Sequence, residues 1–135
     1  MKTKKRVNSK QKGKAGERFA AAYLRSIGFK DARRTAQNKG TTDSSDVECP
    51  QSLPRVYLEI KYGYPRTVFD LGGVRWVAAC DLAAKTCGSK AWAILWRPKG
   101  CSEWRLTFPA RGTQMTISGD VAIKGQLLWL NEDEL

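Results

Sequence analysis

The sequence contains no histidine, and its four cysteines include no C-x-x-C pair. Structural zinc sites are built from histidine and cysteine ligands, so such a site here would need all four scattered thiols of Cys49, Cys80, Cys87 and Cys101. We therefore expect reduced thiols. Cys80 and Cys87 lie seven positions apart in an apolar helical pattern, which indicates small buried side chains.

Long apolar runs are also absent. No stretch approaches the roughly 18 apolar residues of a membrane span, and the lysine-rich start is not followed by the apolar segment of a signal peptide. We therefore expect a cytoplasmic, intracellular protein that does not contact a membrane.

Acidic residues are scarce, because 13 Asp and Glu stand against 24 Lys and Arg and give a net charge of +11. Such a charge favours polyanionic partners, above all nucleic acid. Residues 1–14 carry seven basic side chains and no acid, and we interpret them as a flexible basic arm. A solvated tail that aids solubility remains the alternative. The arm residues expected to contact DNA phosphates are Lys4, Lys5, Arg6, Lys10, Lys12 and Lys14.

The rest of the chain, residues 15–135, has the length and apolar content of a single domain. Residues 15–27 predict an amphipathic helix that ends at Gly28. At about 100° per residue, Glu17 lies within roughly 20° of Leu24, on the rim of the apolar stripe. A carboxylate in that position can point into a site next to the helix.

Alternating side chains predict strands in the next part of the chain. In the most regular strand, Val56, Leu58 and Ile60 face one way, while Glu59 and Lys61 project side by side from the other face. Polar residues between the first two strands favour a loop. The three predicted strands are residues 29–35, 46–49 and 55–62.

The second half of the chain continues with mixed elements. Residues 71–87 predict a helix with Asp70 as its N-cap. The almost wholly apolar residues 91–97 are typical of a central strand buried on both faces. Residues 104–108 predict another strand, and residues 126–130 a last edge element. We therefore expect an α/β fold, with one central mixed β-sheet flanked by helices.

Two carboxylates and a lysine on these strands suggest hydrolytic chemistry. Asp46 begins one strand and Glu59 lies in the next, so a hairpin brings their carboxylates together. Together with the Ile60 backbone carbonyl they form a set of hard oxygen ligands for Mg²⁺. Lys61 is then placed to hold the attacking water and to offset charge in the transition state. A Glu-x-Lys pair on a solvated strand face is the alternative, and Asp43 is a rival to Asp46.

The motifs resemble those of the PD-(D/E)XK nuclease superfamily, most closely the archaeal-type Holliday junction resolvases and their phage relatives. In that family a helix with a glutamate precedes a strand hairpin that carries an aspartate and a Glu-x-Lys. Ser45 departs from the pattern, because the motif has a proline there. The resemblance covers roughly residues 12–97. It is carried by Gly13-Lys14-Ala15-Gly16-Glu17-Arg18, Ser45-Asp46-Val47 and Tyr57-Leu58-Glu59-Ile60-Lys61.

The resemblance implies a restriction-endonuclease-like fold and an Mg²⁺-dependent endonuclease that resolves branched DNA, with Mn²⁺ as an alternative ion and no nucleotide cofactor. Asp46 and Glu59 would bind the metal, Lys61 would be the catalytic lysine, and Glu17 would complete the acidic cluster. The resemblance also implies a loop that carries a polar residue into the site. Candidates for that residue are Gln37, Thr41, Thr42, Ser44 and Ser45.

The same resemblance suggests DNA recombination and repair in a phage or mobile element, carried out by a homodimer, because a four-way junction needs two symmetric cuts. Trp104 and Trp129 are candidates for the subunit interface. Arg33, Arg34 and Lys39 flank the site and are expected to hold phosphates. Two alternatives stay open: a restriction- or repair-type nuclease on duplex or single-stranded DNA, and a non-catalytic basic nucleic-acid-binding protein.

Overall fold

A computed structural model describes residues 9–35 and 46–132, with the side chains of residues 9–13 and 66–74 outside the description. Its helices are α1 (Ser9–Ser26), α2 (Arg66–Cys87) and α3 (Asp120–Asn131). Its strands are β1 (Arg33–Arg34), β2 (Val47–Glu48), β3 (Val56–Tyr62), β4 (Ala91–Arg97), β5 (Arg105–Ala110) and β6 (Thr113–Ser118).

The described strands form a single sheet in the order β1-β2-β3-β4-β5-β6. β3 and β4 run parallel and are joined by α2, whereas the other neighbours are antiparallel. A parallel pair needs a long crossover, which explains why a helix separates these two strands in the sequence. The predicted α/β fold with one mixed sheet is confirmed.

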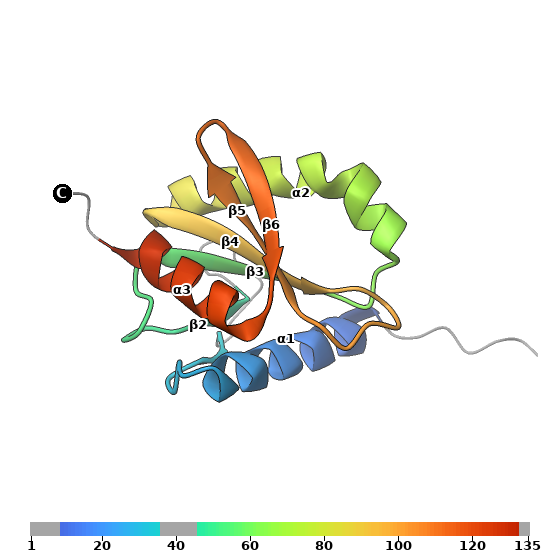
Figure 1. The fold of residues 1–135 in the computed structure, drawn as a ribbon, viewed down its shortest axis with the longest axis horizontal. Helices are drawn as coiled ribbons and strands as arrows, with labels where there is room; N and C mark the ends of the chain where they lie inside the picture. The colour runs from blue at the N-terminus through green and yellow to red at the C-terminus, as the bar shows by residue number, and fades with distance from the viewer. Residues whose placement is uncertain (1–8, 36–45, 133–135) are drawn as a thin grey trace, which may run out of the picture.

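Helices cover both faces of this sheet (Figure 1). Leu58 of β3 and Leu95 of β4 pack with Leu24 of α1 and Leu127 of α3. On the opposite face Trp96 and its neighbours pack against α2. β4 is buried by both layers, which accounts for its nearly unbroken apolar sequence. Trp92 and Trp96 are core residues, with Trp76 of α2 packed against them.

Two helices begin earlier than predicted. α1 begins at Ser9, so Lys10, Lys12 and Lys14 of the expected arm belong to a helix. α2 begins at Arg66 after Pro65 and has no side-chain cap, so Asp70 lies inside the helix and is not its N-cap. Proline is favoured at helix starts because its φ is already helical. The left-handed Gly88 ends α2 as expected.

The prediction for the C-terminal part was wrong. Residues 126–130 belong to α3, whose Ile123 and Leu127 are four positions apart and fully buried, as on the inner face of a helix. The edge strand is instead β6, which pairs with β5 after a turn with positive φ at Arg111 and Gly112. β6 is almost entirely exposed, so it lacks the apolar alternation that marks a strand in a sequence.

Gly16 sets the distance between α1 and β3. A Cβ atom built on Gly16 would lie 2.5 Å from the Cβ atom of Tyr62, closer than two such atoms can approach. Because Cβ atoms are fixed to the backbone, a side chain here forces the helix away from the strand. The neighbouring Glu17 therefore depends on Gly16 for its height above the sheet.

We expect Gly16→Ala to lower the free energy of unfolding by about 1–3 kcal/mol, because overpacking outweighs the better helix propensity of alanine. Gly125→Ala in α3 is the matched control, since its Cβ meets nothing within 4 Å. That variant should be more stable by about 0.5–1 kcal/mol. Urea denaturation measures both. Equal stabilisation by the two substitutions would show that α1 does not approach β3 so closely.

Candidate active site

Asp46 is tied to two strands by its backbone and its side chain. Its backbone N–H donates to the Leu58 carbonyl at 3.1 Å, and its own carbonyl accepts the Thr35 N–H at 3.2 Å. Its Oδ2 accepts the Ile60 backbone N–H at 3.0 Å. The carboxylate is therefore fixed against the edge of β3, which is what a preorganised site requires.

The short β2 strand is the reason that this edge is open to a side chain. β2 pairs with β3 at Val47 and Leu58, and Asp46 precedes it directly. The N–H and C=O of a residue in a strand point to the same side. The Ile60 carbonyl therefore points toward the Asp46 side of β3, as a backbone metal ligand there must.

Glu59 and Lys61 lie on the opposite face of β3 from the α1 core, beneath α2. The Lys61 Nζ atom is 3.4 Å from Glu59 Oε2, and both side chains are about three-quarters buried. The same Nζ lies 4.9 Å from the centre of the Trp76 ring in α2, a cation–π contact. Lys61 is thus held between a carboxylate and an aromatic ring.

The two carboxyl groups are coupled. The pKa of Glu59 is raised to about 7, chiefly by burial and next by the negative charge of Asp46, with Lys61 acting in the opposite direction. Burial also raises the pKa of Asp46, although bonds from the Ile60 N–H and the Glu59 carboxyl oppose this. When both carboxyls are ionised, the one nearby lysine compensates only one of the two negative charges. These hard oxygen donors fit a divalent cation.

Glu17 lies near this pair but has its own partner. Its Oε1 is 3.2 Å from Arg34 Nε, in a pair that is partly buried. The charge of Asp46 contributes to the raised pKa of Glu17, though burial is the larger cause. Among residues 9–35 and 46–132, no three His, Cys, Asp or Glu side chains are grouped closely enough to hold a metal. The structure therefore does not bring Glu17 into one metal-ligand group with Asp46 and Glu59.

The other predicted site residues are placed less centrally. Arg33 is 3.4 Å from Glu48 and largely exposed, and Lys14 is exposed on α1. The side chains of Lys10 and Lys12 lie outside the described part of the chain. The following predicted residues lie outside it altogether: Lys4, Lys5, Arg6, Gln37, Lys39, Thr41, Thr42, Asp43, Ser44 and Ser45.

Sequence reasoning missed the cover that α2 places over the acids. Trp76 contacts Lys61, and the pKa of the buried Cys80 thiol is raised by burial and then by the charges of Glu59 and Asp46. The pKa of Tyr57 is raised by the same causes. No pattern in α2 shows that Trp76 and Cys80 lie over the acids, because their roles depend on how the helix lies on β3.

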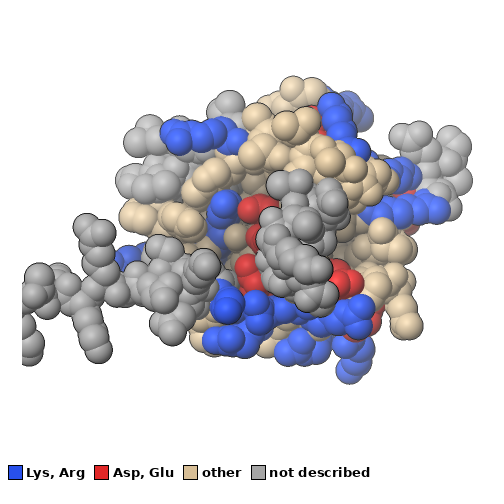
Figure 2. Space-filling view, turned by 180° about the vertical axis from the view of Figure 1, so that it is seen from behind, with Lys and Arg blue, Asp and Glu red and all other residues tan. Residues whose placement is uncertain are grey.

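The face seen from behind brings opposite charges together. Figure 2 shows acidic side chains gathered in the middle of this face, with Lys and Arg side chains around them. A basic surround attracts a polyanion, while acids at its centre attract cations.

None of the described helices combines the length and the apolar character needed to cross a membrane.

Comparisons with protein-family models, with curated proteins and with solved structures found no match for this chain.

The raised pKa of Glu59 predicts an unusual pH dependence of stability. A carboxyl whose pKa is about 7 when folded and 4.5 in its ordinary state contributes stability below pH 4.5 that is lost as the pH rises through 7. We expect Glu59→Gln, which cannot ionise, to gain about 3 kcal/mol of unfolding free energy relative to wild type between pH 4.5 and pH 8.

Urea denaturation in EDTA at the two pH values measures this gain. The control is Glu103→Gln, which makes the same substitution at an exposed glutamate away from the candidate site. If the stability difference between Glu59→Gln and wild type is the same at both pH values, Glu59 is not a buried carboxyl repelled by Asp46.

Proposed function

We propose that this protein is a metal-dependent endonuclease that hydrolyses DNA phosphodiester bonds. The observation that carries the proposal is the arrangement of Asp46, Glu59 and Lys61 at the open edge of β3, with two coupled carboxyls, one lysine and a backbone carbonyl directed to the same place. The net charge of +11 supports a polyanionic substrate. The order of helix, antiparallel strands and Glu-x-Lys strand agrees with the PD-(D/E)XK resemblance.

Each residue has a role that its surroundings favour. Asp46, Glu59 and the Ile60 carbonyl would hold Mg²⁺ or Mn²⁺, which lowers the pKa of bound water and offsets charge on the phosphate. Lys61, already fixed against Trp76, orients the attacking water and stabilises the negative charge that develops on the phosphate oxygens. Arg34 holds Glu17 beside the acids, so that Glu17 positions solvent at the rim of the site.

We further propose that the protein acts on branched DNA as a homodimer, since two symmetric cuts require two sites. Trp104 does not serve an interface, because it is buried in the core. Trp129 is 67% exposed on α3, with the exposed Val121 and Leu128 on the same helix. Exposed apolar side chains on one element are typical of a protein contact. β6, at the end of the described sheet, is uncharged and lies next to α3.

We expect Trp129→Glu to raise the dimer dissociation constant about tenfold or more, because a charge replaces an aromatic contact. Leu82→Glu on α2 is the matched control, since Leu82 is also 67% exposed. Sedimentation velocity over a range of concentrations measures the effect. The proposed interface would be contradicted if wild type is monomeric at concentrations at which it cuts DNA. It would also be contradicted if Leu82→Glu, and not Trp129→Glu, dissociates the dimer.

The substrate is tested with a labelled four-way junction beside linear duplex and single strand of the same sequence. Paired nicks confined to the junction support a resolvase. Cutting of all three substrates would support the proposed active site but indicate a restriction- or repair-type nuclease in place of a resolvase. Binding without any cutting favours a non-catalytic DNA-binding protein, in which the acids are structural.

A further inference from the structure

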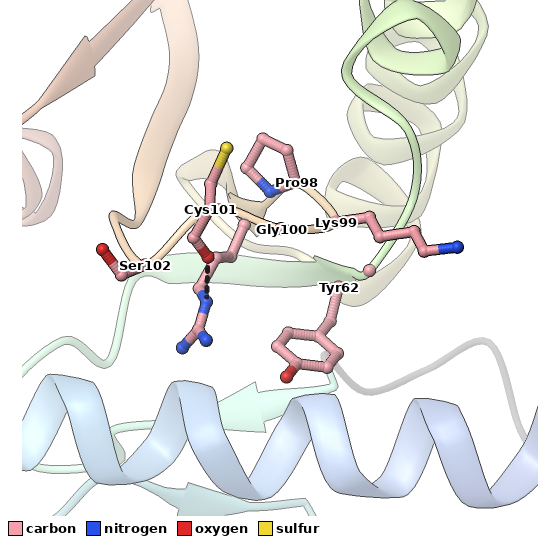
Figure 3. Close-up of a pocket in the computed structure, with 8 residues that line it drawn as sticks. Tyr62, Pro98, Lys99, Gly100, Cys101 and Ser102 are labelled. Atoms are coloured by element: carbon pink, nitrogen blue, oxygen red, sulfur yellow. Dashed lines mark hydrogen bonds between the residues drawn. The ribbon is translucent and has the colours of Figure 1, made fainter.

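A second feature lies at the ends of the parallel strands, beyond the candidate active site. A pocket of about 590 Å³ lies where β3 and β4 end, between Tyr62 and Gly63 on one side and Arg97 with the loop of residues 98–102 on the other (Figure 3). Ligands in α/β folds often bind outside the carboxyl ends of parallel strands. Tyr62 follows Lys61 directly, but its side chain lies on the opposite face of β3, against Phe19 of α1. The pocket therefore lies past the end of the strand from the candidate site.

The lining combines positive charge with an aromatic wall. The described residues that line the pocket include two cations, Arg97 and Lys99, and no acid. Tyr62 supplies a ring, and Ser102 supplies a hydroxyl. Its volume lies within the range of about 300–1,000 Å³ typical of small-molecule sites. This set of groups matches a nucleotide, which has a phosphate, a sugar and a flat base.

Arg97 is held in place from two sides. Its Nε donates to the Cys101 carbonyl at 2.7 Å, the bond drawn in Figure 3. Its guanidinium lies 5.4 Å from the centre of the Tyr62 ring and 5.8 Å from that of Trp104. The terminal nitrogens of an arginine carry four further N–H donors in a fork that suits phosphate. A guanidinium fixed in this way binds an anion with little loss of entropy.

The backbone around Lys99 is also fixed. The Lys99 N–H donates to the Tyr64 carbonyl at 2.9 Å, and the Gly63 N–H donates to the Arg97 carbonyl at 2.9 Å. These bonds join the ends of the two strands. The Lys99 side chain extends outward from the loop in Figure 3 and is exposed. Its ammonium can therefore be replaced without breaking the loop.

We infer that this pocket binds one nucleotide unit of the DNA strand about three nucleotides from the bond that is cut, with its phosphate on Arg97 and its base or sugar against Tyr62, while Lys99 contacts a neighbouring phosphate of the same strand. The inference rests on the proposed function for its ligand. Glu59 and Tyr62 are three residues apart on β3, about 10 Å along the strand. That distance is about the rise of three nucleotides in one strand of a duplex.

The test uses amide chemical shifts of the ¹⁵N-labelled full chain in EDTA, so that no cleavage occurs. Thymidine monophosphate, thymidine, inorganic phosphate and a short single-stranded oligonucleotide are titrated in turn. We expect the monophosphate and the oligonucleotide to shift Gly63, Gly100 and Ser102 more than thymidine or phosphate alone. Shifts spread evenly over the basic surface, or shifts at the pocket with the free monophosphate and none with the oligonucleotide, would overturn the inference.

Two lysine variants then connect the pocket to the substrate. Lys99→Ala should raise the KM for DNA cleavage about fivefold with kcat within twofold, and should reduce the slope of log affinity against log salt by about 0.7 for a single strand. Lys30→Ala is the control, because Lys30 is exposed in the turn after α1. If Lys99→Ala and Lys30→Ala change KM and the salt slope equally, Lys99 contributes only to the general positive charge of the surface. That result would overturn the proposed nucleotide subsite.

The two proposals fail in different ways. If amide chemical shifts change at the pocket but no DNA is cleaved under any condition, the endonuclease proposal is wrong and the nucleotide-binding pocket stands. If wild type cleaves DNA and Lys99→Ala has the same KM and salt dependence, the subsite proposal is wrong and the endonuclease proposal stands.

Discussion

Replacing Lys61 by alanine is expected to lower the rate of metal-dependent DNA cleavage on the order of 10³-fold, while divalent-ion affinity changes little. The reason is the position of its ammonium, 3.4 Å from Glu59 Oε2 and against the Trp76 ring, where it can stabilise charge that develops in the transition state. The oxygen ligands of Asp46, Glu59 and Ile60 remain in this variant, so ion binding should persist.

Single-turnover cleavage and calorimetric titration with Mg²⁺ measure the two properties separately. The chain offers a matched control in Lys85, which pairs with Asp81 at 3.0 Å on the exposed side of α2. Lys85→Ala removes the same charge from a similar ion pair and should leave the rate unchanged. Full activity in Lys61→Ala would remove Lys61 from the mechanism.

Asp46→Asn is expected to have an effect of similar size, with a second readout that does not depend on activity. Asparagine keeps the shape of the side chain, and its carbonyl oxygen can still accept the Ile60 N–H, so the fold should be retained. The loss of the charge removes a ligand for the cation. Cleavage should fall on the order of 10³-fold, and Mg²⁺ binding should weaken with it.

The second readout is the pKa of Glu59. The charge of Asp46 helps to raise that pKa to about 7, so Asp46→Asn should lower it toward the ordinary value of 4.5. Carboxyl ¹³C shifts followed over a pH titration report the change directly. Asp81→Asn on α2 is the control. A Glu59 pKa that does not move in Asp46→Asn would show that the two carboxyls are not neighbours.

The sequence contained enough information to predict the centre of the fold. β3 alternates between apolar and polar residues, so its two faces and the adjacent positions of Glu59 and Lys61 follow from a period of two. β4 is apolar throughout because both of its faces are covered. These patterns reflect burial, and burial acts on each residue of a strand in a regular way.

Exposed and long-range features could not be predicted in the same manner. β6 is exposed, so no burial pattern marks it, and α3 was mistaken for an edge strand because few of its side chains reach the core. Trp76 over Lys61 and the close approach of Gly16 to Tyr62 depend on how a helix lies on the sheet. The pairing of Glu17 with Arg34 likewise arises from two elements far apart in the sequence.

The central claim is that Asp46, Glu59 and Lys61 form one metal-dependent site that cuts DNA. It is tested most directly by incubating a labelled four-way junction with wild type and with Glu59→Gln, each in Mg²⁺ and in EDTA. We predict nicks by wild type in Mg²⁺ and none in EDTA or with Glu59→Gln. Equal cutting by Glu59→Gln, or cutting by wild type in EDTA, would contradict the claim.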